Sequence, residues 1–154
     1  MPLLLELFSG TGSVGKVAKE MGYSVISLDK DMDADLKMDI RNFKYEASPP
    51  HMFDVIWASP PCTEYSRAKS RGVRDIEGAN VITQLTLKII EHFQPKYWII
   101  ENPQTGLLKE QTFMDGIPYD DVDYCKYDMP YRKRTRLWNN IDKLKTRPLC
   151  KKKL

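Results

Sequence analysis

Residues 3–12 read Leu-Leu-Leu-Glu-Leu-Phe-Ser-Gly-Thr-Gly, a short apolar run that leads directly into two glycines. An apolar run of this length that ends in glycine is typical of a buried strand followed by a tight turn. Residues 14–21 then place apolar side chains at helical spacing, and Gly22 stands where helices commonly end. The stretch predicts a strand over residues 3–8, a glycine turn and a helix.

The segments that follow continue this alternation. We expect further strands at residues 24–29, 53–59 and 97–101. Residues 76–93 are expected to form a long amphipathic helix, which Pro95 ends. Two strands joined by a basic loop are expected at residues 121–126 and 135–140. This order predicts an α/β fold: a mainly parallel sheet with helices on both faces and a C-terminal antiparallel strand pair. Ligands of such sheets bind at the carboxyl ends of the strands.

Length and cysteine content limit the class of protein. The 154 residues suffice for one domain, which we expect over residues 1–142, with a basic tail over residues 143–154. No apolar run reaches the roughly 18 residues of a membrane helix, and the N-terminus lacks signal-peptide features. Three widely spaced cysteines, at 62, 125 and 150, argue against a disulfide framework or a metal site. They favour the cytoplasm of a bacterial or host cell, with nucleoid or nucleus as alternatives.

The charge is unevenly spread along the chain. Residues 126–154 carry eleven Lys and Arg against two Asp, whereas residues 1–125 carry thirteen against nineteen Asp and Glu. A basic end on an acidic body is typical of proteins that bind a polyanion such as nucleic acid. For residues 151–153 alone, a solvated lysine tail is the alternative.

The glycine turn and two later carboxylates predict a nucleoside site. Gly10, Gly12 and Gly15 match the G-x-G-x-x-G pattern, and Asp29 follows Gly10 by nineteen residues, at the end of the second strand. A carboxylate at that place accepts hydrogen bonds from ribose hydroxyls, and Asp39 would meet an exocyclic amine of adenine. A tight turn without a ligand and solvated carboxylates are the alternative.

Ser59-Pro60-Pro61-Cys62 ends the strand expected at residues 53–59. Two prolines stiffen the backbone and remove two amide donors, so Cys62 would be presented rigidly at the ligand edge of the sheet. A thiolate is the nucleophilic form of cysteine, and nearby positive charge from Arg67, Lys69, Arg71 and Arg74 would favour it. The alternative is a small buried hydrophobe.

Two more clusters of polar residues follow. Glu101-Asn102-Pro103 ends an apolar strand, where Glu101 would donate a hydrogen bond to a ring nitrogen or serve as a satisfied structural carboxylate. Residues 130–138 read Pro-Tyr-Arg-Lys-Arg-Thr-Arg-Leu-Trp, whose alternating arginines would anchor phosphate or hold a carboxyl group. A charged edge strand that deters aggregation is the alternative for this segment.

Together these pieces resemble the cytosine-5 DNA methyltransferase family. Residues 5–12 resemble its cofactor motif, residues 59–62 its Pro-Cys motif, residues 101–103 its Glu-Asn-Val motif and residues 127–136 its Tyr-Gly-x-Pro-Gln-x-Arg-x-Arg segment. Their order and rough spacing agree over residues 3–140. The chain departs from the pattern at Pro103, Asp128 and Tyr131, and it carries one extra residue in the arginine segment. The family places a target-recognition domain and a final helical motif after this segment, and we expect neither in the fourteen residues that follow Asn140.

The resemblance implies a single Rossmann-like domain of the class I S-adenosylmethionine-dependent type. It implies a Cys62 thiolate that adds to carbon 6 of cytosine, Glu101 at ring nitrogen 3, and Arg134 or Arg136 holding the base or Glu101. It also implies S-adenosylmethionine as cofactor, held by Phe8, Ser9, Gly10, Thr11, Gly12, Ser13, Val14, Asp29, Lys30, Asp39, Ile40 and Pro60.

The substrate implied by the resemblance is DNA, either a duplex with a flipped cytosine or a single strand. Short family versions occur in viruses and phages, and others serve restriction-modification. One alternative is a non-catalytic subunit that binds cofactor or nucleic acid and needs a second protein chain for target recognition. Another is methylation of an exocyclic amine, which Ser59 and Cys62 disfavour because that class has an Asp/Asn-Pro-Pro-aromatic motif there.

Overall fold

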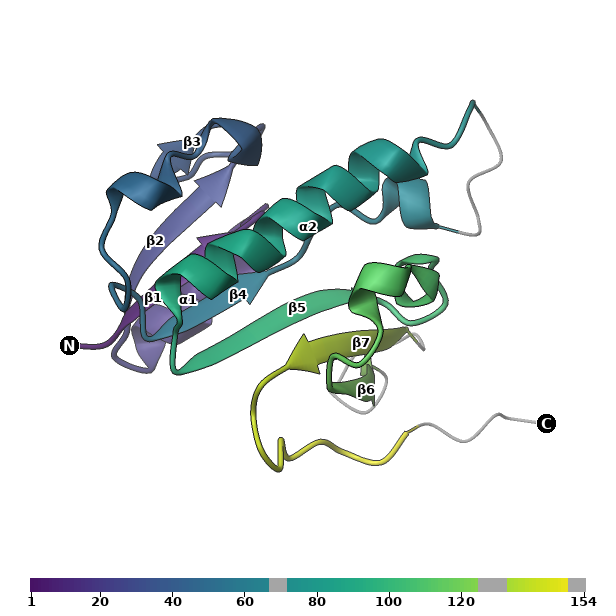
Figure 1. Ribbon diagram of the computed structural model, residues 1–154. Coiled ribbons are helices and arrows are strands. Elements are labelled where there is room, and N and C mark those ends of the chain that lie inside the picture. The colour runs from purple at the N-terminus through teal and green to yellow at the C-terminus, as the bar shows by residue number, and fades with distance from the viewer. Residues whose placement is uncertain (67–71, 125–132, 150–154) are drawn as a thin grey trace.

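The computed structural model describes residues 1–66, 72–124 and 133–149, which form one seven-stranded sheet with two α-helices (Figure 1). Arg67, Lys69 and Arg71, proposed to support the thiolate, lie outside the described residues, as do Cys125, Cys150 and residues 127–132 of the arginine segment. The strands are β1 (Leu3–Leu7), β2 (Ser24–Asp29), β3 (Leu36–Lys37), β4 (Val55–Ala58), β5 (Tyr97–Pro103), β6 (Tyr119–Asp123) and β7 (Arg134–Asn139). The helices are α1 (Ser13–Glu20) and α2 (Ile76–Phe93).

The sheet runs in the order β3-β2-β1-β4-β5-β7-β6. The first five strands are parallel to one another, and β7 is antiparallel to both of its neighbours. The predicted fold class is therefore confirmed. From β1 the chain moves to β2 and β3 on one side and later to β4 and β5 on the other. This reversal opens a crevice at the carboxyl ends of β1 and β4, where ligands of such sheets bind.

The two helices cover opposite faces of the sheet, as predicted (Figure 1). Side chains alternate along β1, so that Leu5 and Leu7 pack in the core with Ile89 and Phe93 of α2. Glu6 points to the other face, where its carboxylate accepts a hydrogen bond from the start of α1. The α2 layer is the larger of the two, because α2 has 18 residues and α1 only eight.

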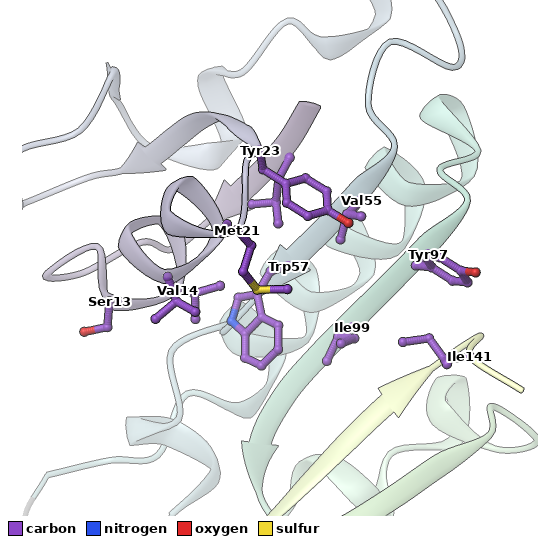
Figure 2. A pocket seen from close by; sticks show the side chains of 12 residues that line it. Ser13, Val14, Met21, Tyr23, Val55, Trp57, Tyr97, Ile99 and Ile141 are labelled. Carbon is purple, nitrogen blue, oxygen red and sulfur yellow. The ribbon is translucent and has the colours of Figure 1, made fainter. Parts of the chain in front are cut away.

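The short α1 leaves part of its face of the sheet uncovered. Beside it lies a hollow of about 620 Å³ over β1, β4 and β5, with an almost wholly apolar lining. Figure 2 shows Trp57 of β4 between the side chains of α1 and those of Ile99 and Ile141. This hollow is separate from the carboxyl-edge crevice, since the two linings share no residue.

The observed element bounds differ from the predicted ones at several ends. The first strand stops at Leu7, because Phe8 has a φ of 58° and begins the turn. The fifth strand continues to Pro103, because Asn102 and Pro103 pair with β7. The last two strands each begin earlier than predicted, in register with one another. Strand β3 and the 3-10 turns Ile40–Asn42 and Tyr45–Ala47 were not predicted.

The described part of the basic tail lies against the last two strands. Leu144, Lys145 and Thr146 line a hollow of about 370 Å³ together with Val122 and Leu137. The domain boundary at residue 142 stays a prediction. Among the residues that the structure describes, no helix is both long enough and apolar enough to cross a membrane.

Candidate active site

The glycine turn is fastened to the end of β2. The N–H of Ser9 donates to the carbonyl of Leu28 at 3.0 Å, and the N–H of Gly10 donates to Asp29 Oδ2 at 2.8 Å. Gly12 has a φ of 78°, a left-handed conformation that a side chain would strain. The turn is therefore shaped by glycine and held by the carboxylate that was predicted to bind ribose.

A buried carboxylate beneath this turn was missed at the sequence level. Glu6 is only 2% exposed, and its Oε2 accepts the N–H of Gly15 at 2.6 Å. Burial raises the pKa of Glu6, although the Gly15 N–H and the charge of Lys19 oppose this shift. A single carboxylate inside an otherwise apolar strand was the available signal, because a charge at such a place needs a partner.

A crevice of about 400 Å³ opens where β1, β2 and β4 end. Five of the residues predicted to bind the cofactor line it together, namely Phe8, Asp29, Lys30, Asp39 and Ile40. The remainder of the lining is supplied by Leu28, Asp31, Met38, Arg41, Ser59, Pro61 and Ile82. The crevice therefore joins the predicted nucleoside site to the two residues that flank Pro60.

The other predicted cofactor residues do not line this crevice. Thr11 and Gly12 face a neighbouring hollow that also includes Glu6. Ser13 and Val14 border the apolar hollow of Figure 2. Ser9 has a buried hydroxyl oxygen without a hydrogen-bond partner among the described residues.

Two carboxylates of the crevice, those of Asp29 and Asp39, favour the ionised form. Burial would raise the pKa of Asp29, but the N–H groups of Met32, Gly10 and Asp31 donate to its carboxylate and lower the pKa on balance. The hydrogen bonds from Arg41 lower the pKa of Asp39 to about 2. Both groups are therefore hydrogen-bond acceptors at neutral pH.

Cys62 lies exposed on the loop that leaves β4. The 3-10 turn Thr63–Tyr65 follows it at once. Asn102 of β5 is 1% exposed, and its Nδ2 donates to the carbonyl of Pro60 at 2.9 Å. This bond ties the loop before Cys62 to the strand that carries Glu101. Asn102 was quoted only as part of a motif and was not predicted as a site residue.

Glu101 is half-buried near the carboxyl end of β5, where the hydroxyl of Tyr124 lies 3.5 Å from its Oε1. The two predicted arginines are held elsewhere. Arg134 forms a two-pronged ion pair with the buried Asp123, and Arg136 forms one with Asp121.

The register with β5 explains why the arginines lie apart from Glu101. Arg136 stands opposite Asn102, whereas Glu101 stands opposite Leu137. Directly opposed residues share a face of an antiparallel pair, and successive residues alternate. Arg134 and Arg136 therefore occupy the face opposite to that of Glu101, and their assignment to the base stays a proposal.

Comparison with known proteins then identifies the family. The family model for C-5 cytosine-specific DNA methylases matches residues 4–114, which include the glycine turn, Cys62 and Glu101. The chain belongs to this DNA methylase family. Its predicted family membership is thereby confirmed.

Named relatives of this chain come from a virus and a bacterium. A Frog virus 3 (isolate Goorha) protein named "Probable DNA (cytosine-5)-methyltransferase" is 38% identical over 154 residues, covering 90% of this chain and 71% of the relative. The type II methyltransferase M.FnuDI of Fusobacterium nucleatum is 32% identical over 122 residues, covering 71% of this chain but 34% of the relative.

Solved structures of methyltransferases share the fold. A methyltransferase of Entamoeba histolytica superposes with a TM-score of 0.68 at 14% identity, covering all of this chain and 58% of that one. A DNMT2 mutant of Spodoptera frugiperda gives 0.62 at 17% identity, covering 89% and 49% respectively. The chain therefore spans about half the length of the solved proteins that it matches.

Proposed function

We propose that this chain transfers a methyl group from S-adenosylmethionine to carbon 5 of cytosine in DNA, with Cys62 as the covalent nucleophile. One observation carries the proposal. The nucleoside-sized crevice at Asp29 is walled by Ser59 and Pro61, and the very next residue after Pro61 is the exposed Cys62. A nucleophile and a cofactor that must act on one base are thus expected at adjoining places on the same sheet edge.

The residues of the crevice fit the nucleoside part of S-adenosylmethionine. Asp29 and Asp39 supply ionised acceptors, which suit ribose hydroxyls and an exocyclic amine. Phe8, Met38 and Ile40 supply apolar surface for a base. The buried Ser9 hydroxyl has no partner among the described residues and so offers a further polar contact.

The proposed chemistry begins at Cys62. Its thiolate adds to carbon 6 of cytosine, and the electron pair displaced from the ring double bond makes carbon 5 nucleophilic. S-adenosylmethionine, when bound, supplies the electrophilic methyl group that carbon 5 takes. The proton of carbon 5 then leaves to a base and the carbon–sulfur bond breaks, which returns the thiolate and the aromatic ring.

Glu101 is proposed to act on the same ring from β5. A hydrogen bond between its carboxyl group and ring nitrogen 3 would stabilise the electron-rich adduct. The bond from Asn102 to Pro60 holds the Cys62 loop against this strand. Arg134 and Arg136 remain candidates for holding DNA or base, each through guanidinium hydrogens not engaged by Asp123 or Asp121.

A partner-dependent subunit is the second candidate function. The observation in its favour is that the two arginines expected to hold the base or Glu101 lie on the other face of the sheet, each in an ion pair with an aspartate. In that case the chain would bind cofactor and nucleic acid, while a second protein chain would supply target recognition.

Methyl transfer with base analysis tests the proposal. Purified chain is incubated with methyl-labelled S-adenosylmethionine and with duplex DNA, single-stranded DNA or RNA, and the product is digested to nucleosides. We expect 5-methylcytosine from DNA with the wild type and none with Cys62→Ser. Label on an exocyclic amine would contradict the proposal, and no transfer despite intact cofactor binding would favour the partner-dependent subunit.

A further inference from the structure

We propose that Tyr65 is a positioning residue for Cys62, because its hydroxyl fastens the cysteine-bearing turn to α2 while its backbone fastens the turn to the segment that follows β5. The inference rests on the proposed role of Cys62 as nucleophile. It assigns a task to a tyrosine that lies three residues beyond the cysteine and outside the motifs used so far.

The side chain of Tyr65 is fully buried, at 0% exposure. Its hydroxyl donates to Asn80 Oδ1 at 2.8 Å and lies 3.1 Å from Thr83 Oγ1. Burial raises the pKa of the Tyr65 hydroxyl, although the Thr83 hydrogen bond opposes the shift, so the group keeps the proton that it donates. Asn80 and Thr83 both belong to α2, which spans the core side of the sheet.

The hydrogen bonds continue from Asn80 and return to Tyr65. Asn80 Nδ2 donates to Gln111 Oε1 at 3.0 Å, and Gln111 Nε2 donates to the carbonyl of Leu107 at 3.0 Å. The N–H of Leu107 donates to the carbonyl of Tyr65 at 2.8 Å. The four residues thus form a closed ring of bonds between the cysteine-bearing turn, α2 and the segment after β5.

The backbone of Tyr65 connects this ring to Cys62. The N–H of Tyr65 donates to the carbonyl of Cys62 at 3.0 Å. On the other side, Gly106 packs so closely that an added Cβ would lie 3.3 Å from the carbonyl oxygen of Tyr65. The turn is therefore held directly against the chain that leaves the Glu101 strand.

Cys62 needs such an anchor because its own side chain is not packed in the core. Cys62 is exposed, and no regular helix or strand includes it. A buried anchor three residues away sets where the sulfur stands relative to Glu101. Because a displacement of about 1 Å in a reacting group costs on the order of 100-fold in rate, a fixed anchor matters for the covalent step.

The test compares Tyr65→Phe with a matched control in a background carrying Cys125→Ser and Cys150→Ser. Tyr65→Phe keeps the ring and removes the hydroxyl. Thr86→Val removes another buried hydroxyl of α2, whose one partner among the described residues is the carbonyl of Ile82 within the helix. The first measurement is the rate of covalent adduct formation with saturating 5-fluorocytosine DNA and cofactor, since fluorine blocks the loss of a proton from carbon 5.

The second measurement is amide hydrogen exchange at Tyr65 and Leu107 in the absence of DNA. It reports how often the hydrogen bonds of the turn open, independently of the reaction of Cys62. We expect Tyr65→Phe to slow adduct formation about tenfold at unchanged cofactor affinity, and to speed exchange at both amides. Gln111→Leu opens the same ring from its far side and is expected to act in the same direction with a smaller effect. Thr86→Val is expected to leave both readouts as in the wild type.

A wild-type adduct rate in Tyr65→Phe would overturn the proposal, as would an equal slowing by Thr86→Val. If the wild type forms no adduct, the proposed function fails, and hydrogen exchange alone decides the role of Tyr65. Unchanged exchange in Tyr65→Phe would then overturn it.

Discussion

Removing the Asn102 side chain tests how the Cys62 loop is held. In Asn102→Ala the buried carbonyl of Pro60 loses the donor that lies 2.9 Å away. An unsatisfied buried acceptor costs about 1–3 kcal/mol, and the small cavity adds about 1 kcal/mol. Asn102 Oδ1 has no partner among the described residues, so its removal offsets part of this cost. We expect a net loss of about 2 kcal/mol of unfolding free energy.

Asn139→Ala is the matched control, because Asn139 is equally buried but bonds to Asp120 and to Leu137. Urea unfolding followed by tryptophan fluorescence measures stability for both variants, and adduct formation with 5-fluorocytosine DNA measures the site. Both variants should lose stability, while only Asn102→Ala should slow adduct formation, by about tenfold. An Asn102→Ala protein that is destabilised yet forms adduct at the wild-type rate would refute the reasoning.

Three further predictions concern the crevice at Asp29 and the start of α1. Asp29→Ala should weaken S-adenosylmethionine binding by on the order of 1–3 kcal/mol, and calorimetry showing unchanged affinity would remove Asp29 as the ribose ligand. Asp39 has a pKa lowered to about 2 by Arg41, so its contribution to stability is present above the unfolded pKa near 4 and is lost as pH falls through about 2. Urea unfolding of wild type and Asp39→Asn should therefore converge at low pH, and a constant difference would count against the ion pair. Gly15→Ala would place a Cβ 3.0 Å from Glu6 Oε1, so we expect thermal unfolding to show a loss of about 1–3 kcal/mol of unfolding free energy. A gain in stability would mean that the Glu6 side chain moves away from the added Cβ without cost.

Strong local patterns predicted much of the fold. The bounds of β2 and α2 agree with the prediction to the residue, because each has a clear apolar period and a defined end. Gln94 takes the left-handed conformation after α2, directly before Pro95. Phe8, Asp29 and Asp39 share one crevice because the ends of neighbouring parallel strands meet at one edge.

Long-range contacts account for what the sequence could not predict. The face on which Arg134 and Arg136 lie follows from the register of β7 against β5, and a shift of one residue would have reversed it. The bond from Asn102 to Pro60 joins residues 42 positions apart. In the sequence, Tyr65 is simply one aromatic residue in a loop. Its proposed role as an anchor follows from its contacts with α2.

The central claim is that the exposed Cys62 sulfur attacks the base beside the cofactor crevice. Its most direct test is mass spectrometry of the complex trapped with 5-fluorocytosine DNA and S-adenosylmethionine, after denaturation and proteolysis. The account predicts a nucleotide joined to the peptide that contains Cys62, and no such species from Cys62→Ser. A nucleotide on Cys125 or Cys150, or an adduct that survives in Cys62→Ser, would contradict it.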